Sequence, residues 1–271
     1  MIVFHHSDLD GHCSAAIIKY CYQLDSLFRQ LFIECDYNKP INYDIVKKNE
    51  QVYVVDFSLD FDKLLEKTKN IVWIDHHINA IEKFKKFEFL DGIRLSDVAA
   101  CELTWSSLFS HRKVPHIVSR LADYDAWKFD FEDTWQVQEG IKLFNWSTDS
   151  ENWNDWLEDR GIKTILDVGD VCVKYRDKLN AKAVKRAYEV NFEGYKCLVL
   201  NTAKSGSIQF NSVDGYDIYI TTNFDGKNWI VNLYNSNQPK QGKVDVGRIA
   251  KKHNGGGHFG ASGFVCQNLP F

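Results

Sequence analysis

The chain has 271 residues, of which 44% are hydrophobic and 26% are charged, and its formal net charge is -4 at pH 7. This composition is ordinary for a soluble globular protein, and the length suits two modest domains better than one. The slightly negative charge does not indicate a nucleic-acid binder, for which a basic surface is the usual signal. A polyanionic substrate would therefore have to be held locally, by metal ions or by a small basic patch.

The lack of a recognisable signal peptide or membrane span leads us to expect a cytoplasmic protein, and the cysteine pattern agrees with this. Residues 1–6 lack the basic region and apolar stretch of a signal peptide, and no apolar run reaches the roughly 18 residues of a membrane span. The seven cysteines are scattered and form no CxxC pair. We therefore expect reduced, mostly buried thiols rather than a disulfide framework or a structural zinc site.

The first predicted strand, Ile2-Val3-Phe4, leads into an acidic turn and then into a helix of small and apolar residues. The turn reads His6-Ser7-Asp8-Leu9-Asp10-Gly11. Two carboxylates so close together repel each other unless cations neutralise them. The turn is therefore either a helix cap, which needs only one aspartate, or part of a metal site.

Three more strands are expected at Phe32–Cys35, Val52–Val55 and Ile71–Ile74. Asp56 directly follows the second of these, and Asp75-His76-His77 follows the third. Taken alone, each is better explained as a polar strand end or a helix cap. Open α/β sheets, however, bind ligands at the carboxyl ends of their strands, and consecutive strands usually lie side by side.

The middle of the chain is expected to be helical. A capped helix begins within residues 96–105, and an apolar helical stretch around residues 117–122 precedes Asp123. Four tryptophans follow in a polar helical region, and we interpret them as core anchors rather than platforms for bases; they are Trp135, Trp146, Trp153 and Trp156. Apolar residues at helical spacing between 162 and 188 predict a long amphipathic connector.

The last part of the chain changes to strands, at residues 197–200, 217–222 and 229–234, with an Asp225-Gly226 hairpin signal between the last two. A short basic helix at residues 245–252 then runs into Gly255-Gly256-Gly257-His258. Backbone without Cβ atoms approaches an anion closely, and successive N–H groups form a nest for phosphate. We interpret this loop as an anion site rather than a flexible surface loop.

These signals share one chemistry. Carboxylate and imidazole ligands without cysteine suit hard-to-borderline divalent ions, and favour Mn²⁺ over structural zinc. Two such ions about 3.5–4 Å apart, bridged by an aspartate, activate water and stabilise charge on a phosphoryl group. We expect two Mn²⁺ ions, with Mg²⁺ or Co²⁺ as substitutes.

With these motifs in order, the sequence resembles the DHH phosphoesterase superfamily, including its nanoRNase, oligoribonuclease and RecJ-like members. Four N-terminal motifs carry the likeness, in this order: His6–Gly11, Asp56, Asp75-His76-His77 and Asp123. Residues 245–258 resemble the glycine-rich signature of the associated C-terminal domain. The resemblance implies an α/β fold, in which a parallel-sheet catalytic domain is joined by a helical linker to a smaller α/β substrate-binding domain. The implied ranges are residues 1–160, 161–190 and 191–271.

The resemblance also implies site roles. One metal would be held by His6, Asp8 and Asp56, and the other by Asp10, Asp56, His76 and Asp123. Asp75 and His77 would be catalytic, with Asp75 orienting its neighbours and His77 contacting the scissile phosphate. His258 and the glycines Gly255, Gly256 and Gly257 would grip a terminal phosphate or nucleotide.

Two departures from the family pattern concern the site. Some subfamilies place the first histidine where this chain has Phe4, which favours His6 as the ligand and leaves the role of His5 open. Many relatives carry an arginine before the glycine loop, where this chain has Leu233-Tyr234-Asn235-Ser236. Tyr234 is a candidate to stack on a base instead.

The resulting hypothesis is a Mn²⁺-dependent phosphodiesterase that hydrolyses short RNA or DNA oligonucleotides, including dinucleotides, to mononucleotides. Three alternatives stay open: a RecJ-like single-strand exonuclease, a phosphatase for cyclic dinucleotides or nucleoside bisphosphates, and an inactive nucleic-acid-binding module. Family-II pyrophosphatases share the N-terminal motifs but resemble the chain less after residue 190. A homodimer is also left open.

Overall fold

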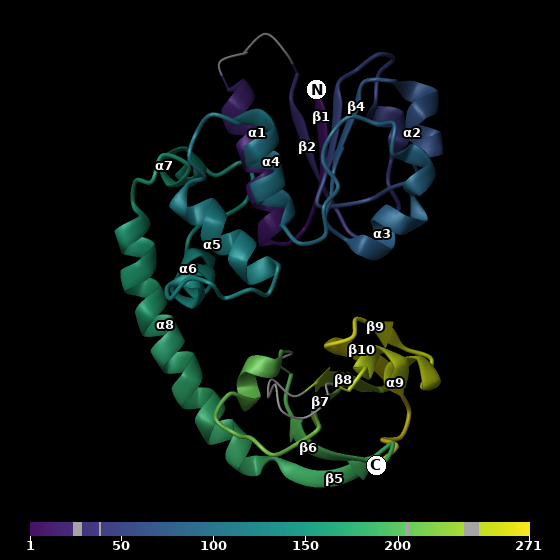
Figure 1. Cartoon of the computed structure of the whole chain (residues 1–271), viewed down its shortest axis with the longest axis vertical. Coiled ribbons are helices and arrows are strands. Elements are labelled where there is room, and N and C mark those ends of the chain that lie inside the picture. Colours follow the sequence, from purple (N-terminus) through teal and green to yellow (C-terminus); the bar gives the residue numbers. More distant parts are fainter. Residues whose placement is uncertain (24–28, 38, 204–205, 236–243) are drawn as a thin grey trace. The chain divides into compact units, whose positions relative to one another are not determined.

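A computed structural model describes the chain except residues 24–28, 38, 204–205 and 236–243, so Ser236 lies outside the described part. The chain divides into two compact units, Met1–Val173 and Lys174–Phe271. The first contains a four-stranded parallel sheet and the second a six-stranded mixed sheet (Figure 1). The predicted α/β class, with a parallel sheet in the N-terminal part, is confirmed.

In the parallel sheet the strand order is β2-β1-β3-β4. These strands are β1 (Ile2–His6), β2 (Leu31–Cys35), β3 (Val52–Val55) and β4 (Ile71–Ile74). All four lie close to the predicted positions, and β3 and β4 have the predicted bounds. Strands covered on both faces are apolar at nearly every position, which makes them easy to identify from sequence.

Helices cover both faces of this sheet, with α1 and α4 on one side and α2 and α3 on the other (Figure 1). Side chains alternate between the faces along each strand. Val55 and Ile74 pack with Ile18 of α1, whereas Trp73 packs with Phe61 of α2. The α-helices of this unit are α1 (Leu9–Tyr22), α2 (Phe61–Lys67), α3 (Ile78–Lys83), α4 (Ala100–Leu108), α5 (His116–Asp125), α6 (Thr134–Gly140) and α7 (Asn152–Trp156), and α8 (Ile162–Ala183) starts in it.

A second core lies among the helices. Trp153 and Trp156 are buried there, against residues of α1, α4 and α5. The prediction that these two tryptophans anchor the core is confirmed. Trp146, by contrast, is only partly buried and packs at the margin of the same cluster. Short 3-10 helices are η1 (Tyr43–Ile45), η2 (Lys85–Phe87) and η3 (Ile141–Leu143).

The second unit contains a mixed sheet with the strand order β5-β6-β7-β8-β10-β9, in which β6 and β7 are parallel. Asp225 closes the predicted β7–β8 hairpin through a hydrogen bond from its N–H to the Asn228 carbonyl, 3.0 Å long. The elements are η4 (Val184–Arg186), β5 (Tyr188–Phe192), β6 (Tyr195–Asn201), η5 (Ser207–Phe210), β7 (Ile218–Phe224), β8 (Trp229–Asn235), α9 (Val246–Lys252), β9 (Gly256–Gly257) and β10 (Ala261–Cys266).

Two global expectations can be compared with this fold. All seven cysteines lie in the described part of the chain and are free; Cys13, Cys35, Cys101 and Cys197 are buried, and the other three are partly buried. None of the helices in the described ranges is both long and apolar enough to cross a membrane.

Candidate metal centre

The turn after β1 brings its first two polar side chains together. Asp8 caps helix α1 by accepting a hydrogen bond from the Gly11 N–H, 3.0 Å away, and its other oxygen lies 2.7 Å from Nδ1 of His6. A Cβ atom at Gly11 would lie 2.3 Å from the His6 carbonyl oxygen, so only glycine allows this close approach. Burial opposes ionisation of Asp8, but the hydrogen bond and charge of His6 outweigh it and hold the Asp8 pKa well below its usual range. The same hydrogen bond raises the pKa of His6.

Asp10 points from α1 to the start of α4. Its two carboxylate oxygens accept hydrogen bonds from the N–H groups of Ala100 (2.8 Å) and Cys101 (2.7 Å). These donors are unpaired within their own helix, and a negative charge there is favourable. Asp10 therefore caps a helix that begins 90 residues later in the chain.

Asp56 lies at the centre of the cluster. It is fully buried in the left-handed backbone region, with φ of 53°, and neither carboxylate oxygen has a hydrogen-bond partner. Its carboxylate oxygens lie 3.2 Å from His76 Nε2 and 3.7 Å from Nδ1 of both His6 and His77. Burial, followed by the negative charges of Asp10 and Asp8, raises its pKa well above the ordinary value. A buried, unpaired carboxylate is costly in isolation, and this one is consistent with a cation ligand.

Asp75, the first residue after β4, is fully buried and fully bonded. One oxygen accepts from the N–H and the Nδ1–H of His77, at 3.0 and 2.8 Å, and the other accepts from the Ser58 hydroxyl at 2.5 Å. Burial lowers the pKa of His77, but the hydrogen bond and charge of Asp75 outweigh it, so the net shift is upward. The geometry holds the imidazole of His77 in one orientation and leaves its Nε2 atom available.

His76 contacts a carboxylate that the sequence did not single out. Its Nε2 atom lies 3.2 Å from Oδ2 of Asp125, the last residue of α5, and 3.7 Å from Oδ2 of Asp10. Burial, followed by the charges of Asp10 and Asp8, raises the pKa of Asp125 well above the ordinary value. Burial lowers the pKa of His76, which favours the neutral imidazole that metals bind.

Asp123, the predicted ligand, has other partners. One of its oxygens accepts from the Asp130 N–H at 2.9 Å, and the other accepts from the Thr134 hydroxyl. Residues two apart on a helix point in nearly opposite directions, so Asp123 faces α6 while Asp125 faces His76. The structure thus gives Asp125 the position that the sequence analysis gave to Asp123. The available signal was that Asp125 follows the buried Leu121 by four residues, which places both on the same face of the helix.

Three groups of ligand atoms in this region could each hold a metal ion, with atoms within 4.8 Å of one another. They are His6, Asp8 and Asp56; Asp10, His76 and Asp125; and Asp56, His76 and His77. Asp56 and His76 each belong to two groups, as expected where neighbouring sites share a ligand. Carboxylates and imidazoles without thiolates form the donor set of a hard-to-borderline divalent ion. The residues present therefore fit one or two such ions.

His5, whose role the sequence left open, lies behind this cluster. It is buried, donates from Nδ1 to the His6 carbonyl at 2.8 Å, and packs edge-on against the ring of His12. Burial lowers its pKa to about 4. His5 therefore supports the backbone of the candidate ligand His6 and does not itself join a metal group in the described residues.

The glycine loop of the second unit forms a tight hairpin with β10. The N–H of Gly255 donates to the Ala250 carbonyl at 2.9 Å, and the N–H of His258 donates to the Ala261 carbonyl at 2.8 Å. These two groups are therefore not open to a phosphate in this structure. A Cβ atom at Gly255 or Gly257 would collide with β10, whereas Gly256 is exposed with no heavy atom within 4 Å of an added Cβ.

Tyr234 on β8 is only 8% exposed, which corrects its interpretation as a base platform. Its ring packs with Leu198, Phe210 and Tyr219, and its hydroxyl accepts a hydrogen bond from the Gly206 N–H at 2.6 Å. A ring enclosed in this way has no free face for a base. The alternation of β8 places Tyr234 on a covered face of the sheet, which its sequence context alone did not reveal.

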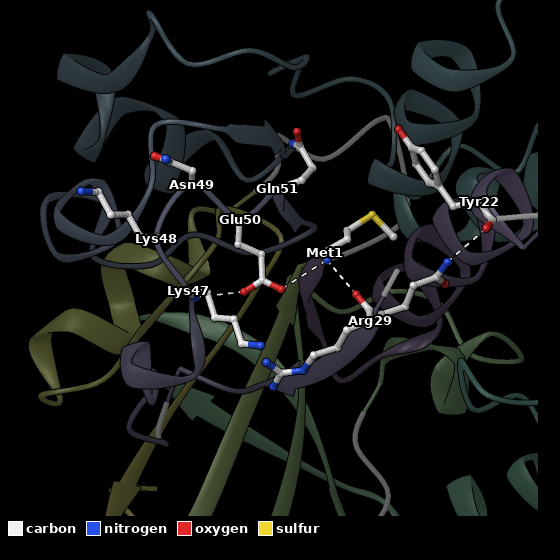
Figure 2. Close-up of a pocket in the computed structure, with 9 residues that line it drawn as sticks. Met1, Tyr22, Arg29, Lys47, Lys48, Asn49, Glu50 and Gln51 are labelled. Carbon is white, nitrogen blue, oxygen red and sulfur yellow. Dashed lines mark hydrogen bonds and ion pairs between the residues drawn. The ribbon is translucent and has the colours of Figure 1, made fainter. Parts of the chain in front are cut away.

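A cavity of about 500 Å³ lies at the opposite, amino-terminal edge of the parallel sheet (Figure 2). It is lined by residues that precede β1, β2 and β3, including Arg29 and Lys47. Glu50 accepts there from the Met1 amino group at 3.2 Å and from the Lys47 N–H at 2.9 Å. This edge presents cations and one satisfied carboxylate, so it does not resemble a cation-binding centre.

By sequence, no protein-family model and no curated protein matches the chain. Solved structures do match. A pGpG-specific phosphodiesterase, PggH, from Vibrio cholerae is 16% identical with a TM-score of 0.56, over 98% of this chain and 93% of that one. The exonuclease RecJ bound to manganese is 11% identical with a TM-score of 0.50, over 98% of this chain and 85% of that one.

RecJ from Thermus thermophilus, in complex with Mn²⁺, also matches, at 11% identity and a TM-score of 0.50. The match covers 98% of this chain and 49% of the longer RecJ chain. At these identities the likeness concerns the fold. These phosphodiesterase and exonuclease structures belong to the DHH superfamily, and the chain has their fold.

Proposed function

We propose that the chain is a divalent-metal-dependent phosphodiesterase that hydrolyses short oligonucleotides to mononucleotides, with Mn²⁺ as its ion. The observation that carries the proposal is the state of Asp56. It is a fully buried carboxylate without a hydrogen bond, surrounded by other carboxylates and by imidazoles. Among the described residues, the groups of opposite charge nearest to Asp56 are histidines, and a divalent cation would supply the missing charge.

We propose two sites that share Asp56. His6, Asp8 and Asp56 would hold one ion; Asp10, Asp56, His76 and Asp125 would hold the other, with Asp125 in place of Asp123. When bound, two such ions supply an activated water and neutralise charge on the phosphoryl group. The chain's own contribution is to hold Asp8 and Asp10 in place through their hydrogen bonds, and the contact with His6 keeps the pKa of Asp8 low.

His77 is the proposed contact to the scissile phosphate. Asp75 occupies its Nδ1 atom and raises its pKa, so the imidazolium form is favoured and Nε2–H can donate to a phosphate oxygen. Such a preorganised donor stabilises charge that develops in the transition state. Asp75 acts through His77, as a positioning residue that does not itself reach the substrate.

The glycine loop remains a proposed substrate contact. Gly255 and Gly257 have a packing reason to be glycine, but the space around Gly256 is open. Close approach of a ligand would explain glycine at that position. We expect Gly256→Ala to weaken dinucleotide binding without lowering the melting temperature, whereas Gly257→Ala should destabilise the protein because its φ is +139°. Equal melting temperatures and unchanged affinity for both variants would contradict this assignment.

A substrate panel tests the proposed activity. The purified chain is incubated with Mn²⁺ and a 5′-phosphorylated dinucleotide, a 20-mer, a cyclic dinucleotide or pyrophosphate, and Asp56→Asn serves as the inactive control. We expect the dinucleotide to be hydrolysed fastest, as the pGpG specificity of one structural neighbour suggests. Rapid cleavage of only the 20-mer would favour a RecJ-like exonuclease, and preference for the cyclic compound would favour a cyclic-dinucleotide phosphatase. Binding without any turnover would leave an inactive binding module.

A further inference from the structure

A cavity of about 390 Å³ opens directly beside the candidate metal centre. Three of its lining residues are the carboxylates Asp8, Asp10 and Asp125, which are proposed metal ligands. Its size falls within the range of about 300–1,000 Å³ that is usual for small-molecule sites. A substrate group attached to a phosphate at the metal centre would therefore have this cavity within reach.

The walls of this cavity are largely apolar and aromatic. Trp146 and Leu121 line it, and Trp146 is held edge-on against the ring of His12, with the centroids 4.9 Å apart. Tyr124 also lines it, packed edge-on against Trp135 at 5.3 Å. Trp146 is only partly buried and lies at the margin of the helical core, unlike Trp153 and Trp156. A flat aromatic group would gain stacking area from such walls.

The remaining wall is polar. Gln138 of α6 is 7% exposed, and its Oε1 atom is buried without a hydrogen-bond partner. Lys142 also lines the cavity, and its nearest carboxylate, Glu139, is at the loose distance of 3.5 Å. An amide with unused hydrogen-bonding capacity is the group that pairs with the edge of a nucleobase.

We infer that this cavity is a nucleobase subsite, in which Trp146 supports the ring face and Gln138 reads the base edge. It would hold one of the two nucleosides that flank the scissile phosphate, next to the proposed ions. The inference rests on the proposed phosphodiesterase function and makes Gln138 and Trp146 its specificity determinants. Trp146 would then combine its packing at the margin of the helical core with a binding role.

The test compares dinucleotides with and without bases. The four 5′-phosphorylated homodinucleotides are assayed with Mn²⁺, together with two versions of the best one that carry an abasic sugar at either position. Trp146→Ala should lower kcat/KM for all four by about 10- to 100-fold, the loss expected for one stacked base. Gln138→Leu should reduce the differences in kcat/KM among the four homodinucleotides by about tenfold. Both effects should vanish on the abasic substrate that leaves the cavity empty.

Gln136→Leu is the matched control. Gln136 lies on the same helix and also has a buried, unpaired Oε1 atom, but it does not line the cavity. We expect this variant to match the wild type on every substrate. Trp146→Phe keeps an aromatic ring and should recover most of the loss, and melting temperatures check that each variant is folded.

Binding gives a second readout that does not depend on turnover. Calorimetric titration of the best dinucleotide into the Asp56→Asn background, with and without Trp146→Ala, should show the same weakening of about 10- to 100-fold. Wild-type affinity in the Trp146→Ala chain would overturn the inference, as would equal losses on base-containing and abasic substrates. If the wild type hydrolyses no dinucleotide but these binding differences hold, the proposed activity fails while the base subsite stands.

Discussion

The two edges of the parallel sheet differ in whether the chain itself provides partners for their carboxylates. At the amino-terminal edge, Glu50 accepts from the Met1 amino group and the Lys47 N–H, so its charge is compensated within the chain (Figure 2). At the carboxyl-terminal edge, Asp56 is fully buried without a hydrogen bond, near Asp8 and Asp10. The first edge balances its charge with the chain's own groups, whereas the second gathers carboxylate and imidazole groups that could hold a metal ion.

Removing the central carboxylate should have the largest effect. Asp56→Asn takes a shared ligand from both proposed metal sites, so we expect hydrolysis to fall by at least about 1,000-fold, roughly 4 kcal/mol of transition-state stabilisation. In the absence of metal the same change relieves repulsion among carboxylates, and the melting temperature should stay equal or rise. Activity is measured on the dinucleotide, and stability by calorimetry with a chelator present. Retained activity, or a collapsed metal-free fold, would contradict the account.

The next largest effect separates Asp125 from Asp123. Asp125→Asn should lower activity by about 100-fold or more and weaken Mn²⁺ binding, because it removes a ligand next to His76. Asp123→Asn should leave the activity of the folded protein near wild type. It should instead cost about 1–2 kcal/mol of unfolding free energy, because it disturbs the hydrogen bonds to Asp130 and Thr134. The reverse pattern would restore Asp123 as the ligand.

A smaller loss is expected at the positioning residue. Asp75→Asn keeps an acceptor for His77 but removes the negative charge, so the pKa of His77 should fall and activity should drop by about 10- to 100-fold. The activity that remains should fall off at lower pH than in the wild type, because His77 loses its proton earlier as pH rises. A uniform loss at all pH values would argue against this role.

The metal-free protein should also reveal the unpaired carboxylate by its pH dependence. Because the pKa of Asp56 is raised in the folded state, the folded chain retains a proton that the unfolded chain releases above about pH 4. The contribution of Asp56 to stability therefore decreases as pH rises through this window. The melting temperature of Asp56→Asn minus that of the wild type should grow from about pH 4 towards neutrality, and a constant difference would be inconsistent with an uncompensated carboxylate.

The smallest effect is expected at the opposite edge. Glu50→Gln removes a charge that local donors already satisfy, so we expect a loss of about 1 kcal/mol or less of unfolding free energy and unchanged hydrolysis. Chemical denaturation and the dinucleotide assay measure both. A large loss of activity would remove the contrast between the two edges.

Local sequence predicted those parts of the fold that depend on local patterns. Strands β3 and β4 were predicted at their observed bounds because buried parallel strands are continuously apolar. The start of α4 was not predicted at its observed residue, because its cap is the carboxylate of Asp10 rather than a residue near 96–97. A cap supplied from 90 residues away leaves no signal beside the helix it stabilises.

Dependence on contacts between distant parts of the chain also explains which site residues the sequence could predict. Residues that follow strands in the first unit, such as Asp56 and His76, were predicted as ligands because strand ends share one rim, and the structure brings these two side chains together. Asp125 comes from a helix, where two neighbouring aspartates differ only in the face they occupy, and packing against α6 decides between them. Burial of Tyr234 likewise depends on the cover of its sheet, which no short stretch of sequence specifies.

The most direct test of the central claim is the number of divalent ions that the folded chain binds at its carboxyl-terminal edge. Equilibrium dialysis with Mn²⁺ at neutral pH, combined with anomalous diffraction from crystals grown with the ion, gives both number and place. We predict two ions per chain beside Asp56 in the wild type, and weakened or lost binding in Asp56→Asn with Glu50→Gln unchanged. Absence of Mn²⁺ beside Asp56, or equal binding by Asp56→Asn and the wild type, would contradict the account.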